Sequence, residues 1–172
     1  MTGATPQHVS RAVRRELQLL MSCVSRDVLV ANTEGATTWI AGTTRLPRGT
    51  GGFVTLVVRY RFAVTADGDR PAGERWQART LGYEYRLGDL DGREIVAFYW
   101  HPEGRSHVRI PHLHLGAALG GLRPEMTKAH LHTGRLTPVA VLSLVFERFG
   151  VRPRRPDWRT ILEQADNVLT MG

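Results

Sequence analysis

The sequence predicts one α+β domain over residues 1–172, with an N-terminal helix, a curved antiparallel sheet of about five or six strands, and two C-terminal helices packed on it. Three observations predict this class. Apolar residues recur at helical spacing near the N-terminus, they alternate with polar residues in the middle of the chain, and helix start signals return in the final third. Alternating βαβ units are absent, so a doubly wound parallel sheet is not expected.

The opening helix is predicted by its start signal and by one apolar stripe. Thr5-Pro6 is an N-cap followed by proline at the first helical position. The apolar residues that follow are separated by three or four positions, as on one face of a helix. They are Val9, Val13, Leu17, Leu20 and Val24.

The middle of the chain has the two-residue period of strands. Residues 53–65 are the clearest strand, since apolar side chains there alternate with arginine and threonine. Further extended segments are expected at 27–31, 36–44, 76–87, 93–101 and 107–115. A turn is expected at 32–35 and a hairpin turn at 88–92, and Pro111 fits an edge strand or a bulge.

Two helices are predicted to close the chain. Thr137-Pro138 repeats the cap-then-proline start, and Gly150 is a typical helix terminator after Phe149. Asp157 is expected to cap the last helix. Its apolar positions are Trp158, Ile161, Leu162, Ala165 and Leu169.

Composition narrows the class of protein. The hydrophobic fraction of 42% is ordinary for a globular chain, and no apolar run approaches the roughly 20 residues of a spanning helix. The single cysteine, Cys23, excludes an internal disulfide framework. We therefore expect a cytoplasmic protein without membrane segments.

The charge is strongly basic and is carried by arginine. Lysine and arginine total 23 against 16 acidic residues, a net charge of +7, and Lys128 is the one lysine. Arginine binds phosphate through a planar fork, so RNA or another nucleic acid is the expected partner. A GC-rich genome would also explain the preference for arginine over lysine, although it would not explain the net charge.

Histidine placement is the strongest local signal. Six of the seven histidines fall between positions 101 and 132, namely His101, His107, His112, His114, His130 and His132. Four of them form two His-x-His pairs. Residues two apart on a strand point to the same face, so each pair would converge on one metal ion or one substrate.

The leading interpretation is a metal-independent ribonuclease that needs no cofactor. RNA supplies its own nucleophile, the 2′-OH, so the enzyme must move protons and stabilise the charge that develops on phosphorus. His112 and His114 would act as the acid–base pair, because imidazole titrates near neutral pH. His101 and Tyr99 would assist them.

Two arginines are the candidates for phosphate binding. Arg109 precedes the first His-x-His pair, and Arg135 follows the second one directly before a predicted helix N-terminus. Backbone N–H groups and the helix dipole favour anions at such a place. The residues around Gly134 would equally form an ordinary turn.

Three other interpretations remain open from the residues alone. In the first, His112, His114 and one of His101, His130 or His132 bind a divalent metal of an enzyme, with His132 taken as the third ligand. In the second, the chain is a non-enzymatic basic protein that binds nucleic acid or a protein partner. In the third, the imidazoles pack between the sheet and the helices without any chemistry.

A tyrosine-rich strand, a hairpin, a strand ending in an aromatic-polar motif and a Pro-His-x-His element follow one another between positions 83 and 115. The residues are Tyr83, Tyr85, Gly92, Ile95, Tyr99, Pro111, His112 and His114. This order resembles the core of TumE-type toxins of bacterial toxin–antitoxin systems. The resemblance implies a basic toxin that acts on RNA and is neutralised by an antitoxin protein. Tyr99-Trp100-His101 stands where that family tends to have Tyr-Asp-Asn.

Overall fold

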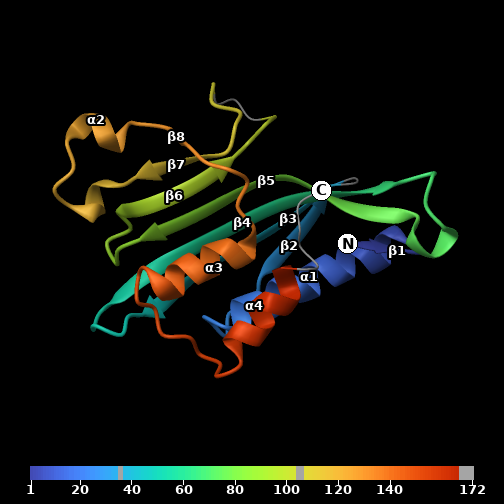
Figure 1. The fold of residues 1–172 in the computed structure, drawn as a ribbon, viewed down its shortest axis with the longest axis horizontal. Helices are drawn as coiled ribbons and strands as arrows, with labels where there is room; N and C mark the ends of the chain where they lie inside the picture. Colours follow the sequence, from blue (N-terminus) through green and yellow to red (C-terminus); the bar gives the residue numbers. More distant parts are fainter. Residues whose placement is uncertain (35–36, 104–106, 167–172) are drawn as a thin grey trace.

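The structure is a computed structural model that describes residues 1–34, 37–103 and 107–166 (Figure 1). In this part of the chain, one antiparallel sheet of eight strands is combined with four α-helices. The order is a two-residue strand, one long helix, five strands to position 100, two short strands with a four-residue helix between them, and two closing helices. The α+β class is therefore confirmed, whereas the predicted count of about five or six strands is too low, because the two-residue strands β1 (Thr2–Gly3) and β8 (Leu131–His132) were not foreseen.

Helix α1 spans Pro6–Ser22 and begins as predicted. The hydroxyl of Thr5 accepts a hydrogen bond from the backbone N–H of His8 at 3.1 Å, and Pro6 occupies the first turn, where its missing N–H costs nothing. Four residues of the predicted apolar stripe form the buried face of the helix together with Met21, whereas Val24 is buried just beyond the end of the helix.

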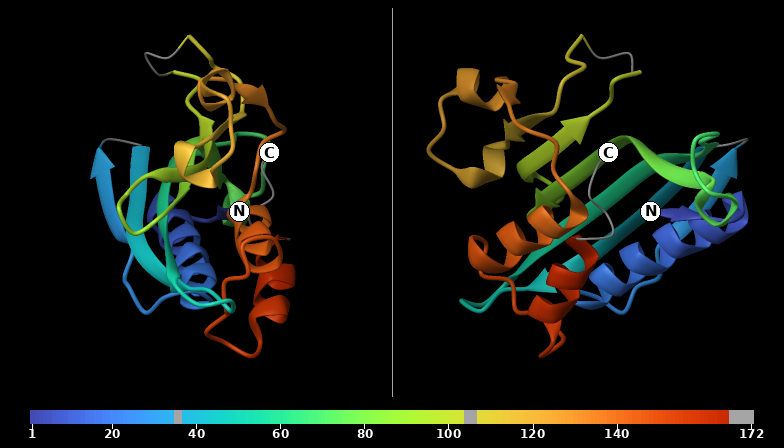
Figure 2. Two further views of the ribbon diagram at one scale, coloured as in Figure 1. Left: turned by 90° about the vertical axis from the view of Figure 1, so that its left-hand side faces the viewer. Right: turned by 45° about the vertical axis from the view of Figure 1, so that its right-hand side comes forward.

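The strands form a single open sheet in the order β2-β3-β4-β5-β6-β7-β8, with β1 paired to β5 (Figures 1 and 2). Their bounds are β1 Thr2–Gly3, β2 Val30–Glu34, β3 Thr37–Pro47, β4 Phe53–Ala66, β5 Trp76–Gly88, β6 Glu94–Trp100, β7 His112–Leu115 and β8 Leu131–His132. Because strands β2 to β8 pair in chain order, every connection between them joins direct neighbours in the sheet.

Alternation along the strands divides the sheet into two faces. On β4 and β5, Tyr60, Phe62, Tyr83 and Tyr85 are buried in the same hydrophobic cluster as α1, α3 and α4. We call this side the core face. The intervening residues, such as Arg59, point to the opposite side, which we call the outer face.

Helices α3 (Pro138–Glu147) and α4 (Trp158–Asp166) lie beside each other on the core face (Figure 1). Thr137 caps α3 by accepting from the N–H of Ala140 at 3.1 Å, and Gly150 follows the helix with φ of +62°. Both features were predicted. Asp157 precedes α4, but both its carboxylate oxygens accept from Arg155. No helix in the described ranges is long and apolar enough to cross a membrane.

Two strand predictions are displaced along the chain. The strand expected at 27–31 is Val30–Glu34, so three residues of the expected turn belong to a strand. Thr33 and Thr38 pair across β2 and β3 with their hydroxyl oxygens 3.1 Å apart, and polar pairs of this kind overrode the turn preference. Gly35, position 36 of the strand expected at 36–44, and Leu169 lie outside the described residues.

The edge of the sheet differs most from expectation. Only His112–Leu115 of the segment 107–115 forms a strand, directly after Pro111, because proline cannot donate to a ladder. Short elements were not predicted at all, because they are too short to show a repeating hydrophobic pattern. They are β1, β8, the 3₁₀ turns at Ala72–Glu74 and Ala117–Leu119, and α2 (Pro124–Thr127).

The backbone packs closely at this edge because residue 116 is a glycine. Its backbone N–H bonds to the carbonyl oxygen of Ile95 at 2.9 Å, and a Cβ there would overlap the carbonyl oxygen of Glu94. Gly116→Ala is therefore expected to lower the free energy of unfolding by about 2 kcal/mol, as measured by urea denaturation.

Gly73→Ala is the matched control, because a Cβ at Gly73 meets nothing within 4 Å. This change is expected to stay within about 0.5 kcal/mol of the parent. Equal effects of the two substitutions would contradict the packing of β6 against the residues that follow β7.

Candidate metal centre

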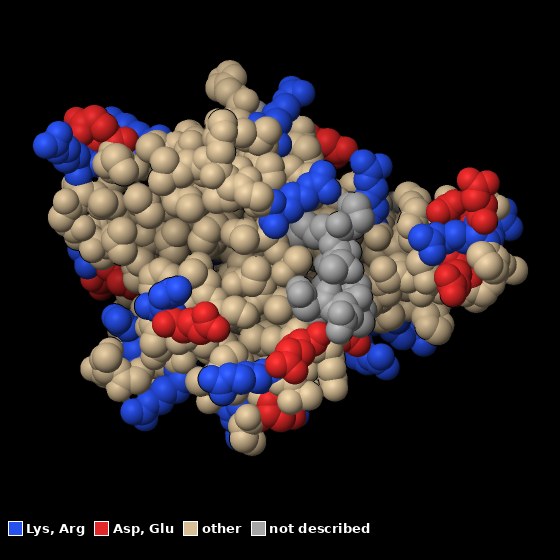
Figure 3. All heavy atoms as spheres, viewed as in Figure 1, with Lys and Arg blue, Asp and Glu red and all other residues tan. Residues whose placement is uncertain are grey.

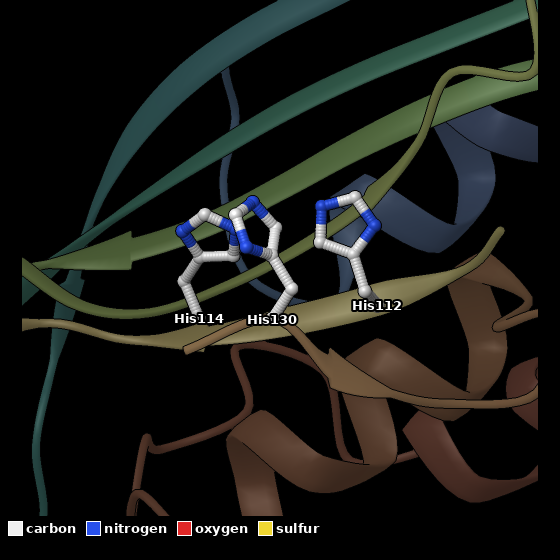
Figure 4. A group of neighbouring side chains, drawn as sticks. All are labelled: His112, His114 and His130. Carbon is white, nitrogen blue, oxygen red and sulfur yellow. The ribbon is translucent and has the colours of Figure 1, made fainter. Parts of the chain in front are cut away.

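Strand β7 presents two histidines to the outer face. His112 and His114 are two residues apart, and in the register of the sheet they lie opposite Tyr99 and Ala97 of β6. Leu113 between them packs toward the core. The predicted alternation is thus confirmed, and the two imidazoles stand on the same side of one strand (Figure 4).

A third imidazole joins them from the neighbouring segment. Strand β8 pairs with β7 so that Leu131 lies opposite Leu113, and continuing this register places His130 opposite His114. The ring of His130 lies 4.4 Å from that of His114 and 5.0 Å from that of His112, centroid to centroid. Figure 4 shows the three rings gathered above β7.

The three histidines can offer their nitrogens to one ion. One ring nitrogen from each of His112, His114 and His130 lies within 4.8 Å of the others, and within the described ranges this is the one group of three metal-ligating side chains found so close together. His112 is buried, His114 is half-buried and His130 is exposed. The group is therefore anchored in the sheet on one side and open to solvent on the other.

The backbone holds His112 in one tautomer. Its Nδ1 lies 2.8 Å from the carbonyl oxygen of Ile110. A carbonyl oxygen only accepts, so Nδ1 carries a proton and Nε2 is the nitrogen left to face a metal ion. Metal-binding histidines are commonly oriented in this way, because the second nitrogen is then directed toward the ion.

His114 has a buried nitrogen without a hydrogen-bond partner. Its Nε2 is shielded from solvent and bonds to none of the described residues. Burial lowers the pKa of His114, and the nearby charges of His130 and His112 lower it further. The imidazole is therefore neutral at pH 7, with its unsatisfied nitrogen in the same cluster as the other two rings.

Tyr99 lies against the histidines but remains a phenol. Its ring centroid is 5.8 Å from that of His112 and 5.2 Å from that of His114. Burial, followed by the charge of Glu94, raises the pKa of Tyr99 to about 12. The hydroxyl donates to Oε2 of Glu94 at 3.2 Å, so Tyr99 is a neutral donor at physiological pH.

His101 continues the outer face beyond Tyr99. The two rings are 5.8 Å apart, and His101 is half-buried. Burial lowers the pKa of His101, whereas the carboxylate of Glu84 opposes that shift. Glu84 is itself buried and accepts from Arg59 at 2.8 Å. The predicted assisting residues, Tyr99 and His101, thus both border the three-histidine group without belonging to it.

The two predicted phosphate-binding arginines have different surroundings. Arg109 is exposed in the segment before β7. The guanidinium of Arg135 stacks over Trp100, 4.1 Å from the ring centroid, and Trp100 belongs to the core cluster. Arg135 thus lies toward the core face, where it borders a cleft of about 650 Å³ lined also by residues of β5.

His132 was named as the third metal ligand in the metal-dependent alternative, and it is not part of the group. Its side chain is exposed at the end of β8. His130, which the same alternative also allowed as the third ligand, occupies that place instead, because it lies beside His114 when the register of β7 and β8 is continued. His107 is exposed in the segment before β7.

Two carboxylates near the site were missed by sequence reasoning. Glu84 is placed on the outer face by simple alternation with Tyr83 and Tyr85, so its position was readable. The position of Glu94 could not be predicted by alternation, because the pairing shifts between Leu87 and Gly88 and leaves Ile95 without a partner. This bulge brings Glu94 to the same face as Tyr99.

No family model, no curated protein and no solved structure matches this chain.

The two strand histidines are expected to respond differently to substitution by leucine. In EDTA, His114→Leu should not lower the free energy of unfolding, because it removes a buried nitrogen that has no partner. His112→Leu should lower it by about 1–2 kcal/mol, because the carbonyl of Ile110 loses its donor. Urea denaturation measures both, and a larger loss for His114→Leu than for His112→Leu would contradict this assignment.

Proposed function

We propose that this protein is a metal-dependent hydrolase whose metal centre is formed by His112, His114 and His130. The observation that carries the proposal is the convergence of three imidazole nitrogens within 4.8 Å on the outer face of the sheet. A buried nitrogen without a partner is costly, and a bound cation would satisfy the one on His114.

Zn²⁺ is the metal that this donor set fits best. Imidazole nitrogen is a borderline ligand that suits zinc, and catalytic zinc sites take three protein ligands and keep one position open. The two carboxylates nearest to Tyr99 and His101 have other partners, since Glu94 accepts from Tyr99 and Glu84 from Arg59. Three neutral nitrogens without a carboxylate leave the full charge of the ion to act on a bound water.

Binding would draw the group together. The ring nitrogens lie within 4.8 Å of one another, so holding one zinc ion among them would require them to approach more closely. His112 and His114 are held by the strand, whereas His130 is exposed and precedes β8. The adjustment would therefore fall mainly on the side chain of His130.

The chemistry follows from the open position. Zinc lowers the pKa of a bound water to about 7 and so supplies hydroxide at neutral pH. Tyr99 would border the metal as a neutral phenol whose proton is donated to Glu94, because burial keeps its pKa high. Hydrolysis of an ester is the reaction that these groups support.

A metal-free ribonuclease is the second candidate, and one observation favours it. Burial lowers the pKa of His114, so that a neutral base stands beside His112. This candidate keeps the acid–base roles predicted from the sequence, with RNA as substrate, an antitoxin as partner and the cytoplasm as location. One of the two arginines named for it, Arg135, stacks over Trp100 on the side of the core face.

Binding without catalysis has less support. On the face seen in Figure 3, basic and acidic side chains are intermixed and lie mostly around the edge, so this face presents no continuous basic tract. Nucleic-acid-binding surfaces gather positive charge along one groove or stripe. The net charge of +7 supports a polyanionic partner without locating it.

Zinc titration of the metal-free protein tests the centre. We expect one Zn²⁺ per chain by calorimetry and elemental analysis. His112→Ala, His114→Ala and His130→Ala should each weaken the affinity at least about tenfold, because each removes a ligand. The exposed His132 and His107 give matched controls, and their alanine variants should bind as the parent does. Equal weakening by His132→Ala would overturn the ligand assignment.

Cleavage of RNA separates the two candidates. With the metal-dependent hydrolase, cleavage of single-stranded RNA should stop in excess EDTA and return on addition of Zn²⁺. Circular dichroism checks that the chelated protein stays folded. Cleavage that persists in EDTA and is abolished by His112→Ala would establish the metal-free mechanism instead.

A further inference from the structure

The outer face carries several arginines, and two of those near the histidines are already neutralised. Arg59 bonds to Glu84 at 2.8 Å, and the carboxylate of Glu84 is buried. Arg61 bonds to Glu103 at 3.1 Å and to the carbonyl oxygen of Leu81. These guanidinium groups have little unbalanced charge to offer to a substrate.

Arg86 differs from both. It lies on β5, it is half-buried, and its guanidinium makes no hydrogen bond and no ion pair with any residue in the ranges 1–34, 37–103 and 107–166. Arginine that is partly removed from water is normally paired, because an unbalanced charge is costly there. The fork of Arg86 is thus free to accept an anion from outside the chain.

The sheet places Arg86 in line with the metal centre. In the register, Arg86 lies opposite Ala97 of β6, and Ala97 lies opposite His114 of β7. Two strand spacings separate Arg86 from His114, about 10 Å between Cα atoms. The residue between them has the small side chain of alanine, so the long arginine side chain can extend over it toward the histidines.

Two observations agree with this placement. Ala97 is fully buried although it lies on the outer face, so the larger side chains beside it cover it. Tyr99 lies two residues from Ala97 and so alternates to the same face as Arg86 and His114. Tyr99 in turn contacts the rings of His112 and His114.

We propose that Arg86 binds the phosphoryl oxygens of the substrate, so that the hydrolase acts on phosphate esters. This inference rests on the proposed function, because the second anchor of the phosphate is the metal held by the three histidines. A guanidinium donates two parallel N–H groups to phosphate, while the ion takes another oxygen of the same group. Arg86 therefore replaces Arg109 and Arg135 as the phosphate-binding arginine.

Phosphate binding to the Co²⁺-loaded protein tests the proposal without relying on turnover. Co²⁺ occupies nitrogen sites of this kind, and its visible absorption reports a change in its ligands. Inorganic phosphate should change the spectrum of the parent, and Arg86→Gln should weaken its affinity at least about tenfold, the scale of one charge-assisted contact. Arg86→Lys should bind phosphate between the two, because it keeps the charge and loses the fork.

Arg45→Gln is the matched control for net charge. Arg45 alternates to the same face but stacks on Phe53, 5.3 Å from the ring centroid, and two strands separate β3 from β6. Phosphate should bind this variant as tightly as the parent. Imidazole, a neutral ligand, should bind the Co²⁺ of all four proteins equally, which shows that the metal centre is intact.

The failures are distinguishable. If Co²⁺ does not bind at the histidines, the proposed function itself is wrong. If Co²⁺ and imidazole bind normally but Arg86→Gln and Arg45→Gln have the same phosphate affinity, the role of Arg86 is wrong and the metal centre stands. A second titration with dimethyl phosphate separates phosphate monoesters from diesters as the substrate. Only a site for diesters would bind dimethyl phosphate with the same dependence on Arg86.

Discussion

Side chains along a strand alternate between the two faces of a sheet, and here α1, α3 and α4 all pack on one of these faces. The alternate apolar side chains of each long strand are buried in that core. The other half is free to carry arginine, glutamate, tyrosine and histidine in rows across β4 to β7. The three-histidine group exists because β7 and β8 prolong these rows at the end of the sheet.

The group also lies where the sheet is weakest. Strand β7 has four residues and β8 has two, so few backbone hydrogen bonds hold this edge. A ligand that binds only the native arrangement stabilises it by mass action. An ion held by both His114 and His130 would therefore tie the segment before β8 to the sheet, and metal binding and order at this edge would be coupled.

Charge on the outer face is arranged by pairing. Glu84 is buried and accepts from Arg59, which leaves that carboxylate neither an open metal ligand nor an unbalanced charge. The bulge after Leu87 turns Glu94 to the same face, where it fixes the hydroxyl of Tyr99. Arg86 has no such partner in the described part of the chain, and this difference gives it a role that its sequence neighbours do not share.

The local patterns of the chain were sufficient to predict the α+β class, the strand β4, and the helices α1 and α3 with their N-caps. They also predicted that His112 and His114 share a face. Each of these depends on residues a few positions apart, whose geometry is set by the helical or the strand repeat. Tertiary structure alone placed His130 beside His114, brought Glu94 to Tyr99 and placed Arg135 over Trp100. These contacts depend on the register between strands and on one bulge, and pairings between distant segments leave no periodic trace in a single sequence.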